Sequence, residues 1–394
     1  MDPPVKPEGS GLGMGLSGCS LAPRAGAWKD RASPPMDQTC LTLRPRPLRV
    51  RHALTALGVL AVLAALAFVL GPLPRALLAA ERLPLGPTPA SVGVAHEDVS
   101  FTTADGIEIA AWWMPDATPA GIDTFTGEPV RTEAVLIFVH GANSNRTSTW
   151  IGSLDRYAHL TRTRHHVLAI DLRNAGASGA TPNGRLGMGA AEADDVIAAV
   201  DYAKSRMPDL PVIAFGASMG GAAVIHAAAR DERIRGLVLF DPVLDGHDAL
   251  VSAAAATTGL PRVLGHMAAF AADAFHGARL RGPSALDLAL AEDRPILVIQ
   301  DDQDPVNRRI HAERLAAGNR AVDLWIAPHP DDPAHPAIDT QGGWGSHVAA
   351  FRLYPEEAEA VTEAFLTMVH AICRAEDAEA DAEADAEAEE TRQP

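Results

Sequence analysis

The residue best placed to do chemistry is a serine enclosed by small neighbours. Residues 216–221 read Gly-Ala-Ser-Met-Gly-Gly, directly after the apolar run 211–215 and directly before an alanine-rich stretch typical of a helix. A serine on such a strand-to-helix turn projects its hydroxyl above the sheet, and this backbone geometry requires small residues on either side. The helix N-terminus behind the serine offers amide donors to a developing negative charge. We therefore predict that Ser218 is a nucleophile.

A serine hydroxyl is a weak nucleophile unless a base takes its proton and a third group orients that base. Asp304 follows the apolar run 296–300, and His347 comes later in the chain, after the last such run. The order Ser, Asp, His is the one expected for a serine on a strand-to-helix elbow. We predict His347 as the general base and Asp304 as the acid that orients it. Asp241, at the end of another apolar run, is an alternative acid.

Other polar residues have a structural interpretation. His329 and His335 share a run rich in Pro and Asp that lacks a recognised metal-ligand spacing, which favours a surface loop. Asp171 and Arg173 are expected to tie one loop to the next, and His165 begins a strand without an evident partner. We expect no metal and no other cofactor.

The elements that must position these residues alternate in type. Short apolar runs rich in β-branched residues alternate with longer alanine-rich stretches, which is typical of a mainly parallel sheet covered by helices on both faces. The predicted strands are 107–114, 134–140, 166–171, 211–215, 237–240, 296–300 and 322–327, and the predicted helices are 190–205, 219–230, 309–317 and 355–373. The fold class is therefore α/β.

One stretch, 243–293, is too long for a simple connection between two strands. Its segments rich in Ala, Leu and Met, such as 262–275, indicate helices. We interpret this stretch as a helical cap inserted over a pocket, with additional core helices as the alternative.

The N-terminal part predicts a membrane anchor. Residues 53–70 carry no charge and are long enough to cross roughly 30 Å of hydrocarbon as a helix. Four arginines precede this run, which favours a cytoplasmic N-terminus and a catalytic domain on the far side of the membrane. A cleaved signal peptide and a buried core helix are the alternatives. The four arginines that precede the run are Arg44, Arg46, Arg49 and Arg51.

These patterns divide the chain into five segments. We expect a disordered tail at 1–52, a transmembrane helix at 53–71, a linker at 72–95, an α/β domain at 96–374 and an acidic disordered tail at 375–394. The acidic tail carries nine carboxylates and one arginine, so it accounts for −8 of the net charge of −17. No basic cluster with interleaved aromatic residues occurs in the sequence, which argues against a nucleic-acid partner.

The motifs together resemble those of α/β-hydrolases, in particular membrane-anchored bacterial esterases, lipases and aminopeptidases. The resemblance covers roughly residues 99–369 and rests on His140-Gly141, the run 171–173, the Ser218 elbow, and the turns that carry Asp304 and His347. It implies an α/β-hydrolase fold. It also implies that the backbone amides of Ala142 and Met219 form an oxyanion hole.

The expected reaction is hydrolysis of a carboxylic ester or thioester through an acyl-enzyme on Ser218. A small ester or lipid-like substrate fits an apolar cap and an anchor that holds the site near lipid. A catalytically silent binding module on a membrane, an acyltransferase and a peptidase remain as alternatives.

Overall fold

The computed structural model describes residues 47–122, 127, 129–332, 335–339 and 344–390. The chain divides into two units, Met1–Ala56 and Leu57–Pro394. The described residues of the first unit, 47–56, are helical. The second unit contains the sheet and its helices.

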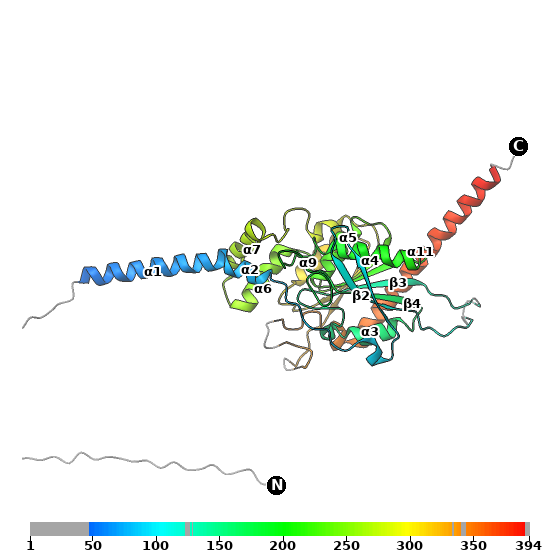
Figure 1. Ribbon diagram of the computed structural model, residues 1–394, viewed down its shortest axis with the longest axis horizontal. Helices are drawn as coiled ribbons and strands as arrows, with labels where there is room; N and C mark the ends of the chain where they lie inside the picture. Colours follow the sequence, from blue (N-terminus) through cyan, green and yellow to red (C-terminus); the bar gives the residue numbers. More distant parts are fainter. Residues whose placement is uncertain (1–46, 123–126, 128, 333–334, 340–343, 391–394) are drawn as a thin grey trace, which may run out of the picture. The chain divides into compact units, whose positions relative to one another are not determined.

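An eight-stranded sheet with the order β1-β2-β4-β3-β5-β6-β7-β8 organises the domain (Figure 1). Strand β1 pairs antiparallel with β2, β2 pairs antiparallel with β4, and all other neighbours are parallel. The strands are β1 (Glu97–Thr102), β2 (Glu108–Met114), β3 (Ala134–Val139), β4 (His165–Ile170), β5 (Val212–Ala217), β6 (Ile234–Phe240), β7 (Ile296–Asp301) and β8 (Val322–Ala327).

Helices cover both faces of this sheet, as the continuous apolar character of the central strands requires. Alternate residues of β3 enter two separate cores, with Ile137 in one and Leu136 in the other. Helices α4 and α5 lie on one side of the strands and α3 on the other (Figure 1). The first core contains residues of α4 (Ala193–Arg206), α5 (Met219–Ala228), α8 (Ala285–Leu290) and α9 (Arg309–Gly318), and the second contains residues of α3 (Ser153–Leu160), α10 (Ala350–Leu353) and α11 (Pro355–Glu390).

The insertion between β6 and β7 is helical, as predicted. It holds α6 (Gly246–Thr258) and α7 (Arg262–His276) in addition to α8. Helices α6 and α7 pack on the end of α1 (Pro47–Leu70) and on α2 (Pro72–Leu77), where Val69 and Leu73 are buried against Ala254 and Ala268. The residues expected to form a linker after the apolar run therefore include a short docked helix.

Several elements differ from the sequence-based prediction. Strand β1 and helix α3 were not predicted. In β1 the exposed positions alternate with only two apolar residues, Val99 and Phe101, which makes a weak strand signal. The last helix, α11, continues through Glu390 instead of ending near Cys373. Alanine and glutamate both have high helix propensity, so the acidic repeat extends the helix although it has no apolar face.

Candidate active site

Ser218 occupies a strained turn between β5 and α5. Its backbone φ of 52° and ψ of −119° lie outside the helical and extended regions, and such strain in a residue other than glycine is characteristic of functional sites. The turn is tightly enclosed: a Cβ atom added to Gly216 would lie 2.6 Å from the carbonyl oxygen of Gly220. One added to Gly220 would overlap the carbonyl oxygens of Val139 and His140. The small residues in the motif are therefore required by close backbone contacts.

His347 and Asp304 form a buried hydrogen-bonded pair. The Nδ1 atom of His347 lies 2.6 Å from Oδ2 of Asp304, and the two side chains are 4% and 0% exposed. The other oxygen of Asp304 accepts from the backbone amides of Val306 and Asn307, at 2.7 and 2.9 Å. These contacts fix the carboxylate after β7 and orient the imidazole ring.

The second ring nitrogen of His347, Nε2, is buried and has no hydrogen-bond partner among the described residues. His347 and Ser218 both line a cavity of about 510 Å³. An imidazole that has one nitrogen held by a carboxylate and the other without a partner, on a cavity shared with a serine, has the features that a general base requires.

The electrostatic environment of His347 favours its protonated form. Burial by itself lowers the pKa of an imidazole, but the charge and hydrogen bond of Asp304 outweigh burial, so the pKa of His347 is raised above 6.5. The neighbouring carboxylates Asp241 and Asp301 act in the same direction. The site therefore stabilises the imidazolium that would form when His347 accepts a proton.

Asp241, the alternative acid, is fully engaged with backbone amides. Its Oδ1 accepts from the amide of Asp301 and its Oδ2 from the amide of Val348, both at 2.6 Å. Burial raises the pKa of Asp241 well above its usual value, and the nearby charge of Asp304 raises it further. Asp241 thus connects the end of β7 to the loop that carries His347, and it is Asp304 that bonds the imidazole.

The two residues expected to supply oxyanion donors flank Ser218. Ala142 lines the same cavity as Ser218, and Met219 is the first residue of α5. Neither backbone amide has an acceptor within the described part of the chain. The loop of Ala142 lies against the serine, because a Cβ atom on Gly141 would be 3.0 Å from the Cβ of Ser218. Both amides are therefore close to the nucleophile and uncommitted.

The walls of the cavity differ from the expectation. None of the described lining residues comes from α6 or α7, so the inserted helices do not cover this pocket. Its walls come instead from the segment 81–86 that follows α2, from the loop 141–151, and from residues near His347. Apolar side chains of α6 and α7 pack against α1 and α2 instead, as described above.

The segment 81–86 is bonded to the loop 141–151. The amide of Glu81 donates to Oδ1 of Asn143 at 2.8 Å, and the side-chain amide of Asn145 donates to the carbonyl of Pro84 at 3.0 Å. The amide of Gly86 donates to the hydroxyl of Thr147 at 3.2 Å. Sequence reasoning assigned 81–86 to a linker and missed this role, although the asparagines of the facing loop were a visible signal.

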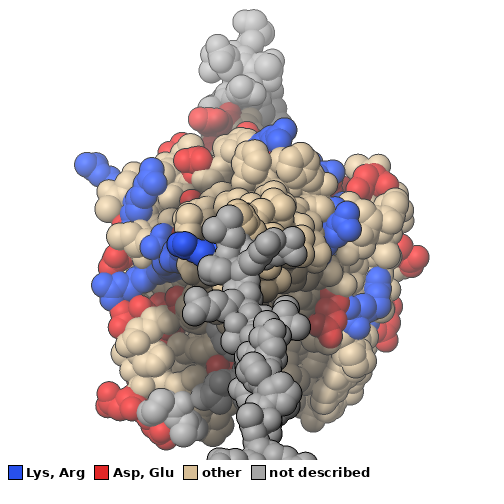
Figure 2. All heavy atoms as spheres, turned by 90° about the vertical axis from the view of Figure 1, so that its left-hand side faces the viewer, with Lys and Arg blue, Asp and Glu red and all other residues tan. Residues whose placement is uncertain are grey.

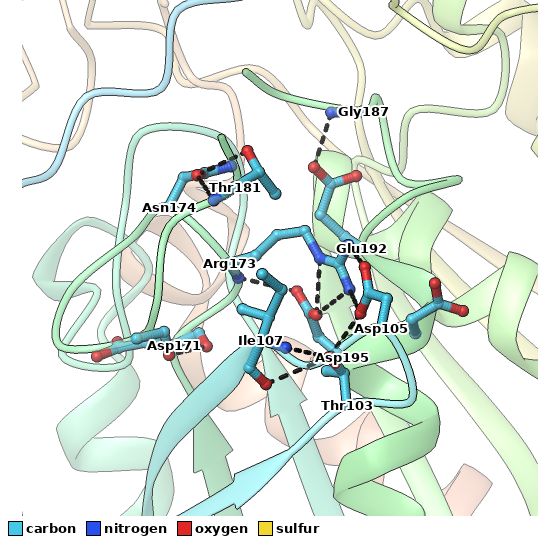
Figure 3. Close-up of polar contacts among 12 residues, drawn as sticks. Thr103, Asp105, Ile107, Asp171, Arg173, Asn174, Thr181, Gly187, Glu192 and Asp195 are labelled. Carbon is cyan, nitrogen blue, oxygen red and sulfur yellow. Dashed lines mark hydrogen bonds and ion pairs between the residues drawn. The ribbon is translucent and has the colours of Figure 1, made fainter. Parts of the chain in front are cut away.

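Asp171 and Arg173 connect loops, as predicted. Oδ1 of Asp171 accepts from the amide of Arg146 at 2.7 Å. Arg173 lies between two carboxylates (Figure 3): Nε donates to Asp195 of α4 and Nη1 donates to Asp105 of the β1–β2 turn, both at 2.8 Å. These residues hold the loops beneath the site and do not line the cavity.

The remaining histidines lie outside the cavity. Nε2 of His140 accepts from the amide of Leu172 at 3.0 Å, so it supports the loop after β3. Nδ1 of His329 lies 3.3 Å from the hydroxyl of Ser346, beside His347, while Nδ1 of His335 accepts from the amide of Ala337. His165, for which no partner was predicted, packs at a tilted angle against the ring of His370.

Similarity to known proteins agrees with this fold. A family model described as serine aminopeptidase, S33, matches residues 130–323, which include Ser218 and Asp304. The uncharacterized protein YfhR of Salmonella typhimurium is 30% identical over 146 residues, which are 36% of this chain and 42% of that protein. The match therefore spans less than half the length of this curated relative.

Two solved structures share the architecture. The esterase Pf2001 of Pyrococcus furiosus has a TM-score of 0.57 at 20% identity, over 74% of this chain and 97% of that chain. The α/β hydrolase GrgF from Penicillium sp. sh18 has a TM-score of 0.51 at 17% identity, over 71% of this chain and 100% of that chain. The chain therefore has the α/β-hydrolase fold, and its residues 130–323 are similar to the family described as serine aminopeptidase, S33.

Proposed function

We propose that this chain is a membrane-anchored serine hydrolase that cleaves a carboxylic ester or thioester. The observation that carries the proposal is the arrangement of His347, with Nδ1 held at 2.6 Å by Asp304 and an unpartnered Nε2 beside the cavity that Ser218 lines. A catalytically silent binding module has no need for a strained serine in that position.

In the proposed mechanism His347 removes the proton of the Ser218 hydroxyl as its oxygen attacks the carbonyl carbon of the substrate. The amides of Ala142 and Met219 stabilise the negative charge that develops on the carbonyl oxygen. His347 then gives its proton to the leaving alcohol or thiol, and an acyl-enzyme remains. A water molecule, activated by the same imidazole, releases the acid and regenerates the serine.

A fluorophosphonate probe tests the nucleophile, because it phosphonylates only an activated serine. We expect labelling of the full chain and no labelling of Ser218→Ala. A folded full chain that does not react would favour the silent module. Hydrolysis of p-nitrophenyl esters of increasing chain length would then report the acyl length that the cavity accepts, and products formed with added alcohols would reveal an acyltransferase.

An aminopeptidase is a second candidate. The matched family is described as serine aminopeptidase, and two carboxylates, Glu81 and Asp339, are among the residues that line the cavity. A carboxylate near the reacting carbonyl attracts the amino group of a peptide N-terminus. Faster turnover of amino-acid p-nitroanilides than of matched p-nitrophenyl esters would favour this candidate over the esterase.

The anchor belongs to the same proposal. Among the described residues, one helical stretch, Arg51–Leu77, is long and apolar enough to cross a membrane. With the arginines on its N-terminal side, we place the N-terminus in the cytoplasm and the hydrolase domain on the other side of the membrane. The substrate would then be a small ester or a lipid-like molecule outside the cytoplasm.

A further inference from the structure

Helix α7 has two faces of different character. One face is built from small residues, and its Ala268, Ala269 and Ala272 are completely buried against α6 and the α1–α2 region. The other face exposes large apolar side chains: Val263 is 65% and Phe270 is 62% exposed. Phe275, at the C-terminal end of α7, is 71% exposed. Such a concentration on one short helix is uncommon on a surface that faces only water.

The helix lies where the apolar part of α1 ends. The side chains of α1 are exposed along most of its length, as Leu60 illustrates at 64%, but Val69 is 1% exposed because it packs against α6 and α7. The ring of His276, the last residue of α7, lies 3.2 Å from the carbonyl oxygen of Leu70. A helix that crosses the hydrocarbon therefore leaves it directly beside α7.

The charges around α7 suit a lipid surface. Arg262 begins the helix, Arg279 and Arg281 follow it, and all three are exposed. Arg262 is paired with Asp248 and Arg281 with Asp273, so the surroundings are not purely basic. Figure 2 views the molecule from the end that carries α1 and α7, and it shows uncharged atoms near the centre with both basic and acidic side chains around them.

From these observations we propose that the exposed face of α7 lies in the interface of the same bilayer that α1 crosses, with Val263 and Phe270 among the acyl chains. Apolar and aromatic side chains on one face of a helix, bordered by basic residues, are the features of helices that lie in a membrane interface. The inference rests on the proposed anchor. It makes the insertion between β6 and β7 a membrane-contact element instead of a cap over the pocket.

Site-specific fluorescence tests the docking. A single cysteine replaces Phe270 in the full chain, with Cys19, Cys40 and Cys373 substituted, and carries an environment-sensitive NBD group. The protein is reconstituted in vesicles of phosphatidylethanolamine and phosphatidylglycerol, some of which contain lipids with a nitroxide on the acyl chain. We expect a blue-shifted emission and quenching by the nitroxide lipids. A probe in Met368→Cys, which is 38% exposed on α11, is the matched control and should show neither.

Two further probes separate the possible failures. A probe in Val62→Cys reports whether α1 is in the bilayer, and fluorophosphonate labelling of Ser218 reports whether the site is intact. Quenching at Val62 without quenching at Phe270 overturns the docking and leaves the anchor and the proposed function in place. A Phe270 probe that is shielded but not quenched indicates a second copy of the chain on α7 and also overturns the docking. No quenching at Val62 overturns both anchor and docking.

A charge substitution provides the converse test. With the probe on Val263→Cys, the substitution Phe270→Glu should abolish the quenching, because a carboxylate is expensive to bury among acyl chains. Unchanged quenching in this variant would contradict a role for Phe270 in the contact.

Discussion

At the residue scale, the candidate site depends on three buried carboxylates that have different tasks. Asp304 is hydrogen-bonded to His347. Asp241 accepts hydrogen bonds from two backbone amides, and Asp301 accepts one from the hydroxyl of Ser346 at 2.8 Å. Carboxylates that lie this close together cannot all be ionised without mutual repulsion. Burial is also the main reason that the pKa of Asp301 is raised. Of these three carboxylates, only Asp304 is hydrogen-bonded to His347, the proposed base.

The substitution Asp304→Asn is expected to lower kcat by about ten-thousand-fold, because an amide no longer selects the productive tautomer of His347. Asp241→Asn should lower kcat far less, and should reduce stability by about 1–3 kcal/mol because an NH₂ group then faces a backbone amide. Ester hydrolysis and urea unfolding of both variants provide the comparison. A larger loss of kcat in Asp241→Asn would identify Asp241 as the acid.

The raised pKa of His347 predicts the pH dependence of the reaction. Only the neutral imidazole accepts a proton from Ser218, so kcat/KM should fall as the pH drops through the pKa of His347, above 6.5. In Asp304→Asn the carboxylate that raises the pKa is gone while burial still lowers it, so this acid limb should move to lower pH. The pH profile with a neutral ester is the measurement, and an unshifted limb in the variant would assign it to another group.

At the element scale, the site is held by close packing of backbone segments that meet at the carboxyl ends of the strands. The elbow after β5 touches the end of β3, and loop residues after β4 are tied to α4. The close backbone contacts leave little room for added atoms, and the loops also depend on their hydrogen-bond partners. Substitutions away from the cavity are therefore expected to affect it.

Gly220→Ala should displace the elbow, because the added methyl group overlaps the carbonyl oxygens of Val139 and His140. Overpacking of this kind destabilises by about 1–3 kcal/mol and should reduce fluorophosphonate labelling of Ser218. Gly121→Ala is the control, since a Cβ atom there meets nothing within 4 Å. Equal labelling of the two variants would show that the elbow tolerates the methyl group.

Arg173→Met should destabilise the domain by about 3–5 kcal/mol, because it leaves the carboxylate of Asp195 buried without its partner. The side chains of this pair are 3% and 0% exposed. Arg230→Met removes a pair with Asp194 whose side chains are 52% and 26% exposed, and should change stability by no more than about 1 kcal/mol. The free energies of unfolding of both variants test the contrast, which fails if they are equal.

At the scale of the whole molecule, only a short stretch of chain separates the proposed membrane helix from the candidate active site. Helix α2 ends at Leu77, and residues 81–86 already form a wall of the cavity. The orientation of the domain across the membrane therefore decides which compartment supplies the substrate.

Cysteine labelling tests this orientation. The sequence contains Cys19 and Cys40 before α1, and Cys373 is buried. In sealed membranes with the outer side exposed, a membrane-impermeant maleimide should leave Cys40 unmodified until detergent is added. A cysteine in Met368→Cys, on the hydrolase domain, should react without detergent. Labelling of Cys40 in the sealed sample would reverse the proposed topology.

The sequence by itself determined the class of fold, the apolar helix and the identity of the elbow serine, because each depends on a local pattern: alternating apolar runs, an uncharged segment, and small residues around Ser218. The order along the chain also indicated Asp304 and His347 as partners. Their proximity is a property of the folded chain. Asp304 follows β7 and His347 follows β8, 43 residues further along the chain, and the two residues meet only when these loops pack together.

Only the tertiary structure decided which carboxylate bonds His347 and what encloses the cavity. Asp241 and Asp304 both follow strands and are equivalent as patterns, but the hydrogen bonds of Asp241 are taken by two backbone amides. Helices α6 and α7 have the composition of a cap, yet they pack on α1 and α2 and leave the cavity to residues 81–86. A pattern of apolar residues indicates that one face of a helix is buried. Which segment buries that face depends on contacts between parts of the chain that are distant in sequence.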